Sequence, residues 1–226
     1  MNVLVALARS PRSGAAVVVR EGRLAGAAIL VAIATTLSTL HAVRIAAEVR
    51  VEDVVFGPER SPVITSLLAT IGRDLTSVVV YVIETAWDAL LALTALSPVL
   101  IWLLGATAIH AAARLYGARR PFLPVVVLVG YATGLTRPLA DGAGLLFGTR
   151  GPGASIAQLA GTVALVWLGV LLWGGIVAHY GLTSGRSLTV LVVALVLFYL
   201  VPLTAIVLAV IAVLVAAVVL EYFPAR

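Results

Sequence analysis

The amino-acid sequence predicts an all-α fold, a polytopic transmembrane helix bundle with about five spans and an amphipathic helix between the first two. The 226 residues are 62% hydrophobic and 11% charged, whereas a soluble domain is about 45–50% apolar and about 25% charged. Several apolar runs reach the roughly 20 residues that a membrane-spanning helix needs. These runs do not alternate polar and apolar side chains, as the strands of a transmembrane β-barrel do, so helical spans are expected.

The N-terminal end is predicted to be a basic tail in the cytoplasm. Residues 1–23 contain four arginines and one acidic residue, and an excess of arginine in a short segment marks the cytoplasmic side of a membrane protein. The first span is predicted over residues 24–43. This run is long enough to cross the membrane and lacks the small-residue cleavage site of a signal peptide, so we expect it to be retained. The expected location is the cell membrane.

Residues 44–92 are predicted to form an extracytoplasmic segment with an amphipathic helix. The first part of this segment is net acidic, which suits the outer side. Ser61 and Pro62 are typical of a helix start, and apolar residues follow at helical spacing to the end of the segment. Glu84 and Asp88 share the opposite face of this helix. We interpret both as solvated, with a buried carboxylate site as the alternative.

Residues 93–226 contain the remaining spans. The second span, over residues 93–113, is followed by the loop RLYGARRP, whose three arginines predict a return to the cytoplasm. The third span begins near Phe122 and places Asp141 at the far membrane face, because a span takes about 20 residues. Pro138 is predicted to kink or end this helix. Residues 139–154 are Gly-rich, and the stretch FGTRGPG within them is predicted to form an outer loop.

The fourth span is predicted over residues 155–178, and the turn HYGLTSGRS then reaches the cytoplasmic face again. The apolar run 188–220 is too long for one upright helix and too short for two comfortable spans. Pro202 interrupts it. One long, kinked fifth span is favoured, and a tight sixth span is the alternative.

Three stretches of this core, IHAAARLYG, LVGYATGLTRPLA and VWLGVLLWGGIVAHYGLTSGRSLTVLVV, resemble the Yip1-domain membrane proteins of prokaryotes. That family has a Gly-Tyr-Ala step with a nearby proline in a central span, and a Trp-containing span that ends in a His-x-x-Leu-Ser/Thr turn. The proline comes later here than in the family pattern, after the stretch TGLTR. The resemblance covers residues 85–210 and implies five spans with a cytoplasmic N-terminus. The matching residues are Gly130, Tyr131, Ala132, Pro138, Trp167, His179, Leu182 and Thr183.

The stretch GYATGLTRPLADGAG, residues 130–144, is a polar break in the third span. Gly130 and Gly134 have the small-xxx-small spacing of closely packed membrane helices. Arg137 and Asp141 lie on one helical face. An interfacial pair at the helix end, with Arg137 snorkelling, is favoured over a proton or ion step inside the membrane. The residues assigned to helix break and packing are Gly130, Tyr131, Gly134, Arg137, Pro138 and Asp141.

Six basic residues are predicted to share the cytoplasmic face and are called the basic rim below. They come from the end of the second span with its following loop, and from the turn after the fourth span. Ordinary positive-inside topology explains such a set. The alternative is a docking surface for anionic lipid headgroups or for an acidic protein partner. The basic rim consists of His110, Arg114, Arg119, Arg120, His179 and Arg186.

The sequence does not favour an enzyme. It contains no cysteine, which excludes disulfides, thiolate metal sites and cysteine nucleophiles. The histidines lack the His-Glu-x-x-His spacing of a metal site, and no nucleophile elbow or phosphate loop is present. We expect no metal and no cofactor. The net charge of +5 is assigned to cytoplasmic loops, and no nucleic-acid partner is expected.

These observations predict a non-enzymatic multi-pass membrane protein that organises the membrane or recruits partners through the basic rim. The alternative is a small transporter or channel subunit that uses the polar break at residues 130–144. The expected partners are the lipid bilayer, with its anionic headgroups, and a protein at the cytoplasmic face. A homo-oligomer is left open.

Overall fold

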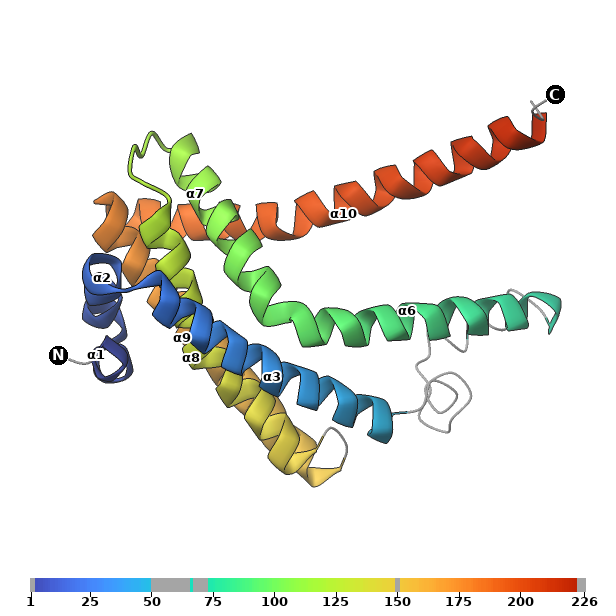
Figure 1. Cartoon of the computed structure of the whole chain (residues 1–226), viewed down its shortest axis with the longest axis horizontal. Helices are drawn as coiled ribbons and strands as arrows, with labels where there is room; N and C mark the ends of the chain where they lie inside the picture. The colour runs from blue at the N-terminus through green and yellow to red at the C-terminus, as the bar shows by residue number, and fades with distance from the viewer. Residues whose placement is uncertain (1–2, 50–65, 67–72, 149–150, 223–226) are drawn as a thin grey trace.

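The computed structural model describes residues 3–49, 66, 73–148 and 151–222, and its regular elements there are all helical (Figure 1). The predicted all-α fold is therefore confirmed. The elements are α1 (Val3–Arg9), α2 (Pro11–Glu21), α3 (Leu24–Glu48), α6 (Arg73–Leu100), the π-helical turn η1 (Ile101–Gly105), α7 (Ala106–Leu115), α8 (Leu123–Phe147), α9 (Pro152–Tyr180) and α10 (Ser184–Tyr222).

Within the described residues, five helical stretches are long and apolar enough to cross a membrane. The first four cover the predicted spans almost completely and extend a few residues beyond them. The chain is thus a multi-pass α-helical membrane protein. The five stretches are Leu24–Glu48, Glu84–Leu115, Leu123–Phe147, Pro152–Tyr180 and Ser184–Thr204.

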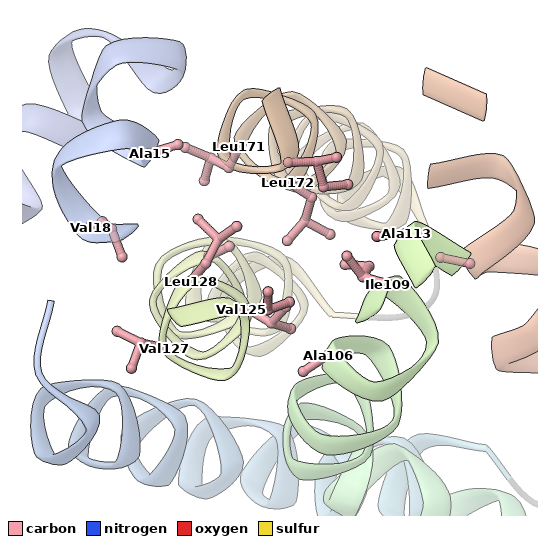
Figure 2. Packing of buried hydrophobic residues seen from close by; sticks show 14 of the residues in the cluster. Ala15, Val18, Ala106, Ile109, Ala113, Val125, Val127, Leu128, Leu171 and Leu172 are labelled. Carbon is pink, nitrogen blue, oxygen red and sulfur yellow. The ribbon is translucent and has the colours of Figure 1, made fainter. Parts of the chain in front are cut away.

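Helix α8 lies at the centre of the bundle, between α3 and α9. More than half of its apolar span, 56%, is buried, compared with 18% for the span in α10. Figure 2 shows Leu128 of α8 facing Leu171 of α9, and Val125 of α8 turned toward Ile109 of α7. Figure 1 shows α10 and the first part of α6 extending away from these packed helices. The residues of the predicted polar break on α8 therefore lie on the most buried of the five spans.

The N-terminal segment, predicted as a tail, contains the two helices α1 and α2. They pack against each other, and α2 also packs against α9 and α8. Leu7, Ala15 and Val18 are fully buried there. At Gly14 the two helices approach so closely that a Cβ atom would collide with the backbone of α1. The apolar residues between the arginines are too few to span a membrane, and they are buried by docking onto the bundle.

Arg12 fastens α2 to the end of α9. Its guanidinium lies 5.0 Å from the ring centroid of Trp173 and donates to Ser184 Oγ at 3.4 Å. A cation–π contact at an exposed site contributes about 0.5–1 kcal/mol. Trp173→Leu is therefore expected to raise the rate of tryptic cleavage after Arg12 and Arg20 about two- to fivefold, because α2 detaches more often. Trp87→Leu on α6 is the matched control, and equal cleavage of both variants would contradict this role of Trp173.

The second span bends near Pro98. It begins as α6, passes through η1 and ends as α7, and Figure 1 shows a change of direction between α6 and α7. Pro98 has no N–H, so the Thr94 carbonyl loses its helical donor. The Ser97 hydroxyl donates to that carbonyl instead, at 2.8 Å. A π-helical turn next to such a proline is a known cause of bending in helices.

The predicted amphipathic helix is continuous with the second span. Helix α6 runs from Arg73 to Leu100 without a break at residue 92, so the boundary expected there is wrong. Glu84 and Asp88 are exposed, in agreement with the solvated interpretation. The predicted helix start at residues 61–62 lies outside the described residues.

The connection between α8 and α9 falls within the predicted loop FGTRGPG, since α8 ends at Phe147 and α9 begins at Pro152. Helix α8 continues through Pro138 to Phe147, so the proline does not end it. Asp141, Ala143 and Gly144 are buried on this last part of the helix, and their packing outweighs the one backbone hydrogen bond that proline removes. Helix α10 likewise continues through Pro202, which agrees with one long fifth helix and not with a tight sixth span.

Candidate functional sites at the two ends of the bundle

The four arginines of the basic rim lie at one end of the bundle and are exposed. Arg114 is in the last turn of α7, Arg119 and Arg120 follow in the connection to α8, and Arg186 is in the first turn of α10. Gly181, with φ +66°, ends α9 so that α10 can begin beside it. Residues 106–123 and 178–190 contain no acidic residue. This end therefore presents positive charge.

The two histidines of the basic rim hold this end together. His110 Nε2 accepts from Arg114 Nε at 3.4 Å, and its Nδ1 lies 2.8 Å from the Tyr180 hydroxyl. His179 Nε2 donates to the Pro121 carbonyl at 2.9 Å. His179 is buried, so it does not face a partner directly. Because these contacts join α7, α9 and the connection to α8, they fix the positions of the neighbouring arginines.

A buried ionic cluster lies in the other half of the bundle, around Asp141 of α8. Asp141 Oδ1 is 3.2 Å from Arg137 Nη2 and 3.3 Å from His41 Nδ1. Its Oδ2 accepts a hydrogen bond from the Ser38 hydroxyl of α3. Arg137 Nη2 also donates to Ser97 Oγ of α6 at 2.8 Å. One carboxylate and one guanidinium thus connect three spans, α3, α6 and α8.

Arg137 and Asp141 are predicted at the end of the third span, but α8 continues to Phe147, so the pair lies inside the helix. The Asp141 side chain is only 3% exposed, whereas that of Arg137 is 24% exposed. Three residues of the cluster were not predicted as part of a site: Ser38, His41 and Ser97. The available signal was that Ser38 and His41 are polar residues three apart inside an apolar span, since polar groups in a span usually face the bundle interior.

Small residues allow α3 to approach α8 along the polar break. Gly130 lies against Ala27 of α3 and the indole of Trp102, and Gly134 lies against Leu30 of α3. Farther along α8, Gly144 lies against the imidazole of His41. A side chain at any of these glycines would collide with its neighbour. Tyr131 is also buried between these helices, so this part of the polar break is a packing surface. The close approach of α3 to α8 allows Ser38 and His41 to reach Asp141.

A cleft of about 780 Å³ opens beside the ionic cluster. It lies between α3, α6, α8, α9 and α10, and we call it the Arg137 cleft. Leu90, Leu93 and Ile45 supply apolar walls, and Arg137 and Asp141 both line the cleft, the aspartate being much the less exposed of the two. The polar side chains in its lining, apart from that aspartate, are His41, Thr94, Ser97, Arg137, Gln158 and Tyr199.

Among the residues that the structure describes, no group of three or more His, Cys, Asp or Glu side chains could hold a metal ion. No protein-family model, curated protein or solved structure matches the chain. The resemblance to the Yip1-domain proteins therefore stays a prediction. The fold and its two polar regions define a class: a multi-pass α-helical membrane protein with a basic rim at one end and a buried ionic cluster in the other half.

Proposed function

We propose that the protein is a non-enzymatic, Yip1-like membrane protein of the cell membrane, with its N-terminus and basic rim in the cytoplasm. The rim recruits an anionic surface, that of an acidic protein partner or of anionic lipid headgroups, and so organises the membrane around it. The observation that supports this proposal is the group of exposed arginines on a packed scaffold, within segments free of acidic residues. Complementary charge favours encounter and selects the partner.

The scaffold strengthens this proposal because the arginines are not on a free tail. Arg114 lies one helical turn after His110, and the hydrogen bonds of His110 and His179 join the elements on which the rim is built. Arginines whose backbone is already ordered lose less entropy when they bind. The helix α2, fastened by Arg12, adds a further basic element beside the rim.

The triple variant Arg114→Gln, Arg119→Gln, Arg120→Gln tests the proposal. Each arginine near an anionic surface contributes about 1 kcal/mol, so the triple variant is expected to weaken binding roughly 100-fold. The protein is purified in a mild detergent, and retained proteins and lipids are identified and quantified. A stoichiometric protein partner, or an enrichment of anionic lipid, is expected with the natural chain and is expected to be lost in the variant.

The matched control replaces the same three arginines with lysine and keeps the positive charge. It is expected to retain the partner, while its membrane orientation, measured with terminal reporter fusions, stays that of the natural chain. If the glutamine variant retains every partner that the natural chain binds, the docking function is wrong. A loss that also occurs with lysine at an unchanged orientation would show that recognition depends on arginine geometry and not on charge alone.

A second candidate function, a small transporter or channel subunit, is favoured by one observation: Arg137 and Asp141 both line a cleft. Gly130 and Gly134 of the same break are packed against α3, so no path passes between α3 and α8 at these glycines. The cleft opens only farther along α8, beside Arg137 and Asp141. Transport therefore needs a second conformation in which α3 and α8 separate. Arg137→Gln with Asp141→Asn is expected to abolish any flux of protons or ions through the protein, and unchanged flux would exclude this function.

A further inference from the structure

We propose that the Arg137 cleft is a binding site for an anionic amphiphile. The anionic headgroup contacts Arg137 and its polar neighbours, and the hydrocarbon chain lies along the apolar walls of the cleft toward the gap between α6 and α10. This site is separate from the basic rim, which lies at the other end of the bundle, and the inference does not rest on the function proposed for the rim.

The charge that the cleft presents is positive. Asp141 is 3% exposed, and its two carboxylate oxygens are already engaged by Ser38, His41 and Arg137. The Arg137 side chain is 24% exposed; its Nε atom is buried and has no hydrogen-bond partner in the described part of the chain, so the exposed part of the guanidinium is the part a ligand can reach. The carboxylate therefore orients the guanidinium, and its oxygens are already engaged, although Asp141 also lines the cleft. A guanidinium held in this way favours phosphate or carboxylate oxygens.

Two other polar groups of the lining, Gln158 of α9 and Tyr199 of α10, can also donate hydrogen bonds. The Ser97 hydroxyl accepts from Arg137 and donates to the Thr94 carbonyl, so it orients the guanidinium instead. Amide and phenol groups both donate. A lining of one accessible cation and two further donors fits a headgroup that is rich in acceptor oxygens.

The apolar walls indicate that the ligand has a hydrocarbon part. Leu90 and Leu93 of α6 are about half exposed, at 54% and 52%, and both line the cleft. Tyr199 of α10 lies on the opposite side and is also exposed. Beyond these residues α6 and α10 diverge (Figure 1). Apolar walls do not stabilise a free, hydrated anion. An amphiphile matches the cleft better, because its headgroup contacts the polar side chains and its hydrocarbon chain contacts the apolar walls.

The size of the cleft agrees with this occupant. Its volume of about 780 Å³ lies in the range of roughly 300–1,000 Å³ that is usual for small-molecule sites. The cleft lies among helices that cross the membrane, so a membrane amphiphile can enter laterally without leaving the hydrocarbon region.

Thiol protection tests the site, because the chain has no cysteine of its own. Leu93→Cys places a single thiol in the cleft, and Leu195→Cys places one on the exposed face of α10, outside the cleft lining. Each protein is reconstituted in phosphatidylcholine nanodiscs, and its reaction with N-ethylmaleimide is timed. The probes are dodecyl phosphate, inorganic phosphate and the uncharged dodecyl glucoside.

Dodecyl phosphate is expected to slow labelling of Leu93→Cys at least tenfold at saturation and to leave Leu195→Cys unchanged. Adding Arg137→Gln is expected to raise the half-protecting concentration at least tenfold. Ser97→Ala keeps the buried ion pair and is expected to raise the half-protecting concentration of dodecyl phosphate severalfold. This variant replaces Arg137→Gln in the test if Arg137→Gln does not fold. The rim variant Arg114→Gln, Arg119→Gln, Arg120→Gln is expected to leave protection intact, which separates this site from the rim.

The proposal is overturned if inorganic phosphate protects as well as dodecyl phosphate, since the site would then take a free anion. Equal protection by dodecyl glucoside would show that the cleft binds hydrocarbon chains without recognising the headgroup, and this result would also overturn the proposal. Absence of protection, or equal protection of Leu195→Cys, would exclude a bound amphiphile in the cleft.

Discussion

Replacing Asp141 with alanine is expected to destabilise the protein by about 3–5 kcal/mol, because the change leaves a charged and largely buried partner unpaired. Arg137 would lose its ion pair at 3.2 Å, and Ser38 and His41 of α3 would lose their acceptor. Helix α3 would then lose both of its side-chain contacts with Asp141 of α8, whereas the hydrogen bond from Arg137 to Ser97 of α6 would remain possible. The measurement is the free energy of unfolding in detergent, obtained from a denaturant titration.

Asp88→Ala is the matched control, since Asp88 is exposed on α6 and its removal is expected to change stability by less than about 0.5 kcal/mol. The double variant Asp141→Ala, Arg137→Leu removes both charges and is expected to recover part of the loss. If Asp141→Ala unfolds at the same denaturant concentration as Asp88→Ala, the cluster does not hold the spans together.

Gly134→Ala is expected to destabilise the protein by about 1–3 kcal/mol, the usual cost of overpacking. A Cβ atom at this position would lie 2.9 Å from the backbone carbonyl carbon of Leu30. Helix α3 would have to move away from α8, and the contacts of Ser38 and His41 with Asp141 would weaken with it. The same unfolding titration measures the effect.

Gly142→Ala is the control on the same helix, because a Cβ atom there meets nothing within 4 Å among the described neighbours. Alanine is the better helix former by about 1 kcal/mol, so this variant is expected to be equally or slightly more stable. A loss of stability at Gly142 that matched the loss at Gly134 would show that helix propensity, and not the approach of α3, decides the outcome.

The helical class of the fold and the spans themselves could be predicted from the sequence, because the apolar runs have the length of the bilayer core. Helix ends were harder to predict. Pro138 lies inside α8 and Pro202 inside α10, since proline removes one hydrogen bond while packing or the surrounding helix supplies many. The two short N-terminal helices were also missed, because α2 packs against α8 and α9, which lie far away in the sequence, and α1 packs against α2.

The ionic cluster could be predicted only in part. The four-residue spacing of Arg137 and Asp141 identifies them as neighbours on one face, and this can be read without a structure. Their partners Ser38, His41 and Ser97 come from two other helices, and no periodicity within one segment shows which faces of different helices meet. Depth was misjudged because the third span was expected to end near Asp141, whereas α8 continues for another six residues.

The docking of α2 onto α9 has a consequence for the order in which the chain matures. Arg12 and Ser184 are 172 residues apart in the sequence, and ribosomes add about 5–20 residues per second. After its own synthesis, α2 must therefore wait roughly 10 to 30 s at that rate until α9 and the start of α10 exist. During this interval the apolar side of α2 has no α9 to cover it. Helix α2 is thus synthesised well before the helix against which it finally packs.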